Sequence, residues 1–441
     1  EKIIVFRNVR GKAEGCAKYL ADELGLPAAT EAEAQLPNND LSRSSSSLRD
    51  ALRGGTAFHN ANLNRQEKMV VERAFRDAQS RVRVLGATTT VAAGINTPAS
   101  TVILAEKEFI GEDGREFTIA EYKNMAGRAG RLGYNEIGRS VILADNEMER
   151  AQLFRKYVLG MPESIVSSFH PDEIETWFVR LLAQLPRILR EDAVKLLSCT
   201  YAGYLENKKS PGWQERTRGI LETFLRRMVE LQLTEEEAGY VQLSLLGRAC
   251  GRSNLKFKSA MRLVELLRSL DASTVTGMGI MAVIQGLDEM DQHARIPIFR
   301  KGSKEEIWPH QASCLFGHDV VLLLQRYVPK DIYDYYARCK KALLLSDWVS
   351  GMSVQDLETK YTLVDNSFWR LTYGSLINIA NMTRFYLKSA SEIASLILLG
   401  ERSIGDEIDR PEPVNKFETR WPIIYRTTPL QPLLTDGASA C

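Results

Sequence analysis

Glu121-Tyr-Lys-Asn-Met-Ala-Gly-Arg-Ala-Gly-Arg131 is the stretch of this chain that decides its fold. It places Arg128 and Arg131 three residues apart, each directly after a glycine. Glycine lets the backbone approach a ligand closely, and a guanidinium binds phosphate oxygens through two parallel hydrogen bonds. Residues three apart at a helix start face the same side. The pattern therefore indicates a clamp on a nucleotide phosphate that stabilises developing charge. Gly/Arg turns also occur in disordered tails, so the surrounding sequence decides between the two interpretations.

The blocks that precede this stretch indicate a parallel α/β sheet. Two short apolar runs, residues 82–85 and 101–104, flank a loop rich in threonine and glycine. In a parallel sheet, the loop at the carboxyl end of a strand is where ligands bind. Farther upstream, residues 55–63 precede a predicted helix at Arg65–Gln79, and the chain opens with a predicted strand within Ile3–Arg10.

Together and in this order, the four blocks resemble the second motor domain of a superfamily-two helicase. The resemblance is strongest to the Ski-like branch, which holds RNA-unwinding exosome cofactors and the archaeal-type DNA-unwinding enzymes. The matching segments are Ile3–Arg10 for motif four, His59-Asn60-Ala61-Asn62-Leu63 for the branch's His-His-Ala-Gly-Leu, Thr88–Ala99 for motif five and Asn124–Arg131 for motif six. Three asparagines depart from the pattern: Asn60 replaces a histidine, Asn62 a glycine, and Asn124 a glutamine, whose amide it keeps on a shorter side chain.

The resemblance implies a role for residues in each block. Arg128 and Arg131 would act as arginine fingers on the γ-phosphate of ATP. The residues that would lie beside the nucleotide are Gly94, Asn96, Asn124 and Gly127. The residues that would contact the nucleic-acid strand are Arg10, Thr88, His59 and Arg370. For His59, the sequence without the resemblance indicates only a polar side chain at a loop.

The composition is that of an ordinary globular protein, with 44% hydrophobic and 26% charged residues among 441. This length suffices for about two to four domains. The net charge of +1 neither requires nor excludes nucleic acid. Basic clusters, such as the one from Arg248 to Arg262, are interpreted as solvated helix faces.

Cysteine and histidine usage indicates a reducing compartment and no metal site. The six cysteines form no C-x-x-C pair and the five histidines lack metal-ligand spacing. Reduced thiols favour a cytoplasmic location, nucleoid-associated or, in a eukaryote, nuclear. The longest apolar run near the end, Ile393–Leu399, is too short to cross a bilayer, so no membrane partner is expected.

Two signatures of a complete motor do not occur in these residues. There is no G-x-x-x-x-G-K-[ST] to cradle phosphates and no D-E-x-H, because Asp288-Glu-Met-Asp291 lacks the histidine. The phosphate-binding lysine and the acid that holds Mg²⁺ would therefore come from an N-terminal RecA-like domain. Since the sequence starts at Glu1 without an initiator methionine, we expect a piece of a longer protein that does not hydrolyse ATP by itself.

The predicted fold class is an α/β RecA-like domain with a parallel sheet, followed by mostly α-helical winged-helix and ratchet-like domains. The predicted boundaries are 1–150 for the second motor domain, 151–252 for the linker and winged helix, 253–400 for the helical ratchet-like bundle and 401–441 for a C-terminal tail. Within the first domain, the serine-rich insertion Pro27–Ser47 is either a disordered linker or the capped start of a helix near Leu48–Arg53.

A β-hairpin is predicted between motifs five and six. Asp113-Gly114 lies between aromatic and β-branched residues, which is a strong short-range hairpin signal. In the DNA-unwinding relatives, a hairpin at this place splits the duplex, and Phe109 and Phe117 would then stack on a base. The alternative is an ordinary surface hairpin whose aromatic rings pack on the sheet.

Thinner resemblances extend through the rest of the chain. Val241–Ala249 resembles the wing strand of a winged helix and the Leu-Gly-Arg-Ala turn that closes it; such a domain either binds DNA or braces the motor, and the family favours the brace. Residues 343–361 resemble the helical ratchet domain, and the next helix is predicted to begin near Asp365–Leu371. In the DNA-unwinding relatives this helix carries an arginine and, two turns later, a tryptophan that contact bases. Arg370 holds the arginine position and Ile377 the tryptophan position.

The resemblance implies the C-terminal half of an ATP-dependent helicase that translocates 3′ to 5′ on single-stranded or forked DNA. ATP and Mg²⁺ would bind through the first motor domain and not to this chain alone. Unwinding of RNA is the alternative within the same branch; no large insert is visible in the winged-helix region, which favours DNA. A catalytically silent nucleic-acid-binding scaffold is the alternative from another class, and the intact Arg128 and Arg131 argue against it.

Overall fold

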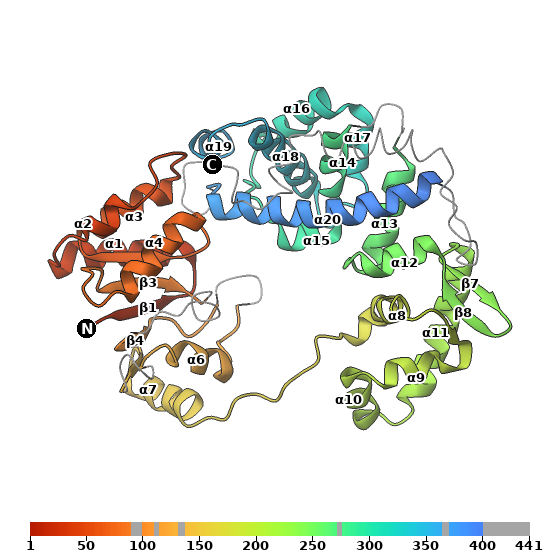
Figure 1. Ribbon diagram of the computed structural model, residues 1–441, viewed down its shortest axis with the longest axis horizontal. Helices are drawn as coiled ribbons and strands as arrows, with labels where there is room; N and C mark the ends of the chain where they lie inside the picture. Colours follow the sequence, from red (N-terminus) through yellow and green to blue (C-terminus); the bar gives the residue numbers. More distant parts are fainter. Residues whose placement is uncertain (90–98, 110–113, 131–136, 271–275, 364–369, 400–441) are drawn as a thin grey trace. The chain divides into compact units, whose positions relative to one another are not determined.

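The structure is a computed structural model, and it describes residues 1–89, 99–109, 114–130, 137–270, 276–363 and 370–399. The chain divides into two compact units. The first comprises Glu1–Ser164 and Ser353–Ser375, and the second comprises Ile165–Met352 and the residues from Leu376 onward. Figure 1 traces the elements of each unit along the sequence.

A five-stranded sheet forms the centre of the first unit. Its strands, in spatial order, are β2 (Thr56–His59), β3 (Val84–Thr88), β1 (Ile3–Arg7), β4 (Thr101–Leu104) and β5 (Arg139–Ile142). Every neighbouring pair is parallel. Ile4, Phe58 and Val102 are fully buried in the apolar core of the unit, as expected for strands of a parallel sheet. The predicted α/β RecA-like class, followed by a mostly helical region, is confirmed.

Helices connect these strands. Those of the first unit are α1 (Arg10–Leu24), α2 (Thr30–Ala34), α3 (Arg43–Arg53), α4 (Arg65–Arg76), α6 (Ile119–Ala126), α7 (Glu147–Leu153), the π-helical turn Phe154–Val158 that continues α7, and α19 (Val354–Lys360). The serine-rich insertion takes the capped alternative, since the Ser42 and Ser45 side chains each accept a hydrogen bond from the other's backbone N–H at 3.1 Å. This capping box starts α3 ahead of the predicted Leu48.

Two acidic side chains fasten α19 to the motor domain. Asp40 accepts a hydrogen bond from the N–H of Val354, the first residue of α19, at 2.7 Å. In return, Glu358 on α19 accepts one from the N–H of Arg43, the first residue of α3, at 3.0 Å. The first N–H groups of a helix have no partner within it, and here each helix start is satisfied from across the contact. We call the contacts made by Asp40 and Glu358 the double cap.

Glu358 also reaches the start of the longest helix. Its Oε1 accepts from the N–H of Tyr373, the first residue of α20 (Tyr373–Leu399), at 3.1 Å. The side chain is buried, and burial raises the pKa of Glu358 although both N–H donors favour the charged form. Part of the region predicted as one bundle, Ser353–Ser375, thus packs with the motor domain; the four-domain division stays a prediction.

The second unit is mostly helical and contains one small antiparallel sheet. The sheet has the order β6 (Ile188–Leu189), β8 (Tyr240–Leu243) and β7 (Thr234–Glu237). The helices around it are α8 (Ile174–Leu182), α9 (Ala193–Ser198), α10 (Tyr201–Lys209), α11 (Trp213–Glu230) and α12 (Leu245–Arg252). The predicted Leu-Gly-Arg-Ala turn is wrong, because Ser244 caps a helix by accepting a hydrogen bond from Gly247 N at 3.1 Å. Leu246–Ala249 therefore lie inside α12.

A helical bundle follows α12. Its helices are α13 (Phe257–Arg268), α14 (Gly277–Ile284), α15 (Asp288–His293), α16 (Ile307–Phe316), α17 (His318–Gln325), α18 (Ile332–Val349) and the part of α20 from Leu376 onward. Among the described residues, no helix combines the length and the apolar character needed to cross a lipid bilayer.

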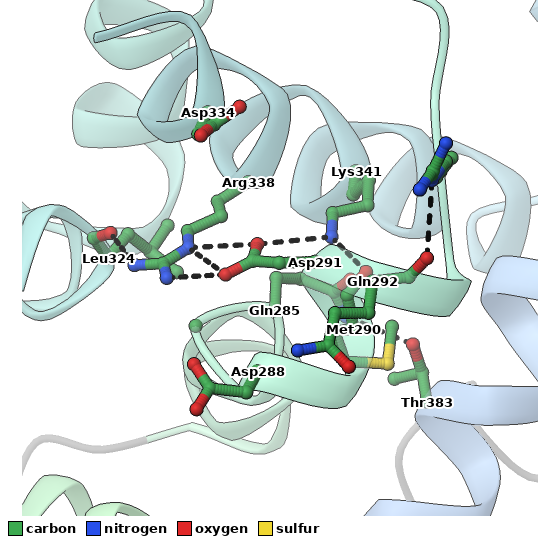
Figure 2. A network of polar contacts seen from close by, with 12 residues as sticks. Gln285, Asp288, Met290, Asp291, Gln292, Leu324, Asp334, Arg338, Lys341 and Thr383 are labelled. Carbon is green, nitrogen blue, oxygen red and sulfur yellow. Dashed lines mark hydrogen bonds and ion pairs between the residues drawn. The ribbon is translucent and has the colours of Figure 1, made fainter. Parts of the chain in front are cut away.

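Helix α18 carries charged side chains into the interior of the bundle, where Arg338 and Lys341 are at most 2% exposed. Arg338 pairs with Asp291 of α15 at 2.6 Å and donates to the carbonyl of Leu324, near the end of α17, at 2.8 Å (Figure 2). Lys341 donates to the carbonyl of Met290 at 2.9 Å, and burial lowers its pKa to about 8. Buried charge is tolerated here because each cation has acceptors in place.

Replacement of Asp291 by alanine should strongly destabilise the bundle. The substitution leaves the Arg338 guanidinium buried without its carboxylate, and removal of one partner of a buried pair costs about 3–5 kcal/mol. Urea denaturation followed by circular dichroism measures the change. Glu222→Ala, on the exposed face of α11, is the control and should change stability by less than about 0.5 kcal/mol. Equal stability of the two variants would show that the backbone carbonyls alone satisfy Arg338.

Candidate nucleotide and nucleic-acid site

Backbone hydrogen bonds join the end of motif five to the first arginine of motif six. Ala99 N donates to the carbonyl of Arg128 at 3.2 Å, and Gly130 N donates to the carbonyl of Ala99 at 3.0 Å. Ala99 lies just before β4, and Arg139, which opens β5, donates to the carbonyl of Ser100 at 2.9 Å. The arginine stretch therefore lies at the amino ends of β4 and β5.

Two glycines allow the backbone of the arginine stretch to approach the segment before β5 closely. Gly130 has a φ of +70°, and a Cβ there would lie 2.6 Å from Gly138 N. A Cβ on Gly138 would lie 2.2 Å from the carbonyl carbon of Ala129. Neither position has space for a side chain, so glycine in this stretch is required by backbone approach as well as by conformation.

The structure locates only part of the predicted nucleotide site. Asn124, on α6, and Gly127, which ends that helix, are exposed, and Arg128 is half-buried. These three residues are close together in the sequence, at and just after the end of α6, near the amino ends of β4 and β5. The other predicted members, Gly94, Asn96 and Arg131, lie outside the described residues.

The predicted strand contacts occupy the opposite edge of the same sheet. Thr88 ends β3 and His59 ends β2, while Arg10 begins α1 shortly after β1. Because all strands are parallel, these residues share the carboxyl edge, where a parallel sheet binds ligands. The two sets of residues that the sequence assigned to nucleotide and to nucleic acid, so far as the structure describes them in the motor domain, thus lie at opposite ends of the strands.

Glu14 on α1 organises the carboxyl edge and was missed in the sequence. Its Oε1 accepts hydrogen bonds from Asn60 Nδ2 at 3.0 Å, Asn62 Nδ2 at 2.8 Å and Ser44 Oγ at 3.1 Å. Asn62 Oδ1 in turn accepts a long, 3.4 Å hydrogen bond from Arg10 Nη1. Asn60 Nδ2 also donates to the carbonyl of Arg10 at 3.2 Å, so two of the three asparagines that depart from the family pattern contact the arginine predicted to grip a strand. The signal available in the sequence was Glu14 itself, one helical turn after Arg10 and on the same face.

His59 is buried, with only 6% of its surface exposed. Its Nε2 lies 3.0 Å from Glu72 Oε1 on α4, and its Nδ1 has no hydrogen-bond partner among the described residues. Burial lowers the pKa of His59, although the hydrogen bond with Glu72 opposes the change. In this structure the ring contacts α4, and its predicted contact with nucleic acid stays a prediction.

The predicted hairpin exists at its base. Phe109 N donates to the carbonyl of Arg115 and Phe117 N to the carbonyl of Lys107, both at 2.8 Å, as in an antiparallel pair. Arg115 also forms two hydrogen bonds with Glu121, at 2.7 and 2.8 Å, and this interaction lowers the pKa of Glu121 to about 2.

Of the two alternatives for the phenylalanines, the structure favours packing. Phe117 is 3% exposed and lies in the core of the motor domain. Phe109 is partly buried against that core, and its ring meets that of Phe117 edge-on at 4.7 Å. Gly114 is exposed, and Asp113 at the tip lies outside the described residues.

Comparison with known proteins supports the resemblance of this chain to helicases. The helicase conserved C-terminal domain matches residues 38–133. The ATP-dependent DNA helicase Hel308 of Caldivirga maquilingensis is 26% identical over 325 residues, which are 71% of this chain and 42% of the relative. Hel308 of Pyrococcus horikoshii is 31% identical over a segment that covers 53% of this chain and 33% of the relative. Hel308 of Pyrobaculum calidifontis is 30% identical over a segment that covers 62% of this chain and 39% of the relative. These matches support the resemblance to the C-terminal half of a Ski-like superfamily-two helicase, and the chain spans less than half the length of the relatives that it matches.

The helix that the Ski-like resemblance predicts to contact bases corresponds to α20, but α20 begins later than the predicted start near Asp365–Leu371. Arg370 precedes α20, which begins at Tyr373, so it does not lie on this helix as predicted. Counting two turns from Arg370 to Ile377 therefore has no helical basis. The aromatic side chain that α20 exposes is Phe385, with 49% of its surface accessible. Sequence patterning missed it because an isolated phenylalanine in an apolar helix is ordinarily read as core.

The motor domain should lose stability at acidic pH in a way that depends on His59. A histidine whose pKa is lower in the folded state binds more protons when unfolded, so its stabilising effect is present above about pH 6.5 and declines as the pH falls below it. We expect the difference in unfolding free energy between the native chain and His59→Gln to shift against the native chain from pH 7 to pH 5. Urea denaturation of both proteins at pH 7 and at pH 5 measures their unfolding free energies. Other groups titrate equally in both proteins, so the comparison uses the difference between the two free energies at each pH. A pH-independent difference would contradict the burial effect.

Proposed function

We propose that this chain supplies the second motor domain and the C-terminal domains of an ATP-dependent DNA helicase that translocates 3′ to 5′. The observation that carries the proposal is the pairing of Ala99 with Arg128 and Gly130 at one edge of the sheet, while Arg10 and Thr88 lie at the other. A motor has to link nucleotide state to its grip on a strand. One rigid sheet with a candidate arginine finger at one edge and candidate strand contacts at the other meets this requirement.

Arg128 and Arg131 would act on ATP bound elsewhere. The sequence holds neither the phosphate-cradling loop nor the D-E-x-H acid, and no cluster of three potential metal ligands occurs in the described part of the chain. These residues alone therefore do not fit a complete ATP–Mg²⁺ site, and an N-terminal RecA-like domain would complete it. The two guanidiniums would supply positive charge to the transferring phosphoryl group, with Asn124 and Gly127 beside them.

The strand would be gripped through its phosphates and the faces of its bases. Arg10, held by Asn62 and Glu14, and Thr88 would contact phosphates. Phe385 offers an exposed ring for a base to stack on, a contact that tolerates any sequence. Single-stranded or forked DNA is the favoured partner because the relatives are named as DNA helicases; RNA is the alternative within the family.

The remaining domains would support the motor. The hairpin tip at Asp113-Gly114 would separate strands, with Phe109 and Phe117 anchoring its base rather than contacting the duplex. The helices and the three-stranded sheet between residues 165 and 252 would form the winged helix and would serve as a brace. The predicted location is the cytoplasm. A silent scaffold remains the rival function, and the experiments below distinguish it.

ATP hydrolysis should require the first motor domain and the arginine pair. The 441-residue chain alone should release no phosphate from ATP, with or without DNA, because it lacks the phosphate cradle.

In the full-length enzyme, Arg128→Ala or Arg131→Ala should lower turnover about a thousandfold or more with nucleotide binding largely kept, since a finger acts on the transition state. Arg73→Ala, an exposed arginine on α4, is the matched control. Turnover by the chain alone, or near-normal turnover of both finger variants, would contradict the proposal.

Single-strand binding by this chain should depend on salt and hardly on sequence, because a translocating motor grips phosphates and stacks on bases. Phe385→Ala and Arg370→Ala should each weaken binding by about 1 kcal/mol or more if a base stacks on the side chain. Fluorescence anisotropy with several labelled oligonucleotides at two salt concentrations measures both effects. Strong preference for one duplex sequence, or binding indifferent to salt, would favour the scaffold.

A further inference from the structure

A pocket of about 600 Å³ lies beside the ends of two helices in the second unit. Its walls come from the last turn of α8 and the residues after it, and from the last turn of α12 and the residues after it. The side chains that matter for its chemistry are Arg180, Arg248 and Arg252. The other lining residues are Ala183, Gln184, Leu185, Pro186, Gly251 and Asn254, none of which carries a negative charge.

Two of the three arginine side chains, those of Arg180 and Arg248, are held by hydrogen bonds but retain unused hydrogen-bonding capacity. Arg180 Nη2 donates to the carbonyls of Asn254 and Leu255 at 2.8 and 3.2 Å, and Arg248 Nη2 donates to the carbonyl of Pro186 at 3.1 Å. The Nε of Arg180 and the Nε of Arg248 are both buried and have no acceptor among the described residues. A buried donor without an acceptor is unfavourable, and a ligand oxygen would satisfy it.

Charge in this pocket is not balanced by the protein. None of the three arginines forms an ion pair with a described carboxylate, whereas Lys256 and Arg262 of the same basic cluster pair with Glu173 and Asp288. The carboxyl ends of α8 and α12 contribute roughly −0.5 charge each, which leaves about +2 at the pocket. Arg252 is exposed, as the interpretation of this cluster as solvated helix faces expects, whereas Arg248 is half-buried and its Nε is enclosed.

An aromatic stack adjoins the pocket. The Arg180 guanidinium lies over the ring of Trp177 with 5.0 Å to its centroid, and Trp177 stacks on Phe169 at 5.3 Å. Trp177 Nε1 is also buried without an acceptor. Rigid arginines next to aromatic rings are the combination with which proteins hold the backbone of a single nucleic-acid strand.

We propose that Arg180, Arg248 and Arg252 form a phosphate-binding site, separate from both edges of the motor sheet. A guanidinium donates to phosphate oxygens in a fixed geometry, and three of them around one pocket suit a single tetrahedral dianion or one backbone phosphodiester. A phosphate of a bound nucleic-acid strand and a free phosphate share this chemistry. The strand-phosphate case rests on the proposed function, and the free-phosphate case is independent of it.

Arg252→Ala tests the site with little risk to folding, because Arg252 is exposed and donates no hydrogen bond to a described residue. Arg227→Ala is a matched control, since Arg227 is likewise an exposed arginine in the last turn of its helix, α11. The affinity of the 441-residue chain for labelled oligothymidylate is measured by anisotropy over a series of KCl concentrations. In parallel, the melting temperature is measured with inorganic phosphate and with chloride at equal ionic strength.

If a strand phosphate binds, Arg252→Ala should weaken oligothymidylate binding and reduce the slope of log K against log salt by about 0.7, the value for one single-strand contact. If a free phosphate binds, the slope stays unchanged, but the phosphate-specific rise in melting temperature should disappear in Arg252→Ala and persist in Arg227→Ala. Either result supports the site. If Arg252→Ala behaves as Arg227→Ala in both assays, the arginines only offset the carbonyls of the helix ends and the proposal is overturned. Loss of all oligothymidylate binding by the native chain, with the phosphate effect retained, would count against the proposed function and not against this site.

Discussion

The candidate site depends on one backbone interaction, the pairing of Ala99 with Arg128 and Gly130. It joins the last residue of motif five to the residues just after α6, and so fixes the backbone of the first arginine relative to the sheet. The pairing requires the chain to pass within van der Waals distance of Gly138, which excludes any side chain at two positions. Gly130, between the two arginines, is thus a packing requirement first, and Gly138 is its partner in the close approach.

The sequence predicted the class of fold because its strands are short apolar runs in a fixed order with the motifs between them. The resemblance assigned the members of the site, whose roles stay predictions, and the structure adds where the described members lie along the strands. Arg10, Thr88 and His59 follow the carboxyl ends of strands, as the pattern indicates, whereas Arg128 is carried to the amino edge by the length of α6. Nothing in local patterning reports the direction in which a helix returns along a sheet.

Long-range polar contacts were also invisible in the sequence. The contacts of Glu14 and the double cap join residues far apart in the chain. Apart from the place of Glu14 one helical turn after Arg10, no spacing in the sequence marks these common polar residue types. Burial likewise decided between alternatives that the sequence left open. The sequence around Phe117 is compatible with a strand-separating wedge and with a core residue. Its position in the core of the motor domain decides for the core residue.

The double cap also has a consequence for the path of the chain. The chain leaves the second unit after Met352 and returns to it at Leu376, within α20. Glu358 accepts from the N–H of Tyr373, so the chain re-enters the second unit within one turn of a capped helix start. That helix then continues without a break for about 40 Å at 1.5 Å per residue. One buried carboxylate thus caps the helix that is shared by both units and also fastens α19 to α3.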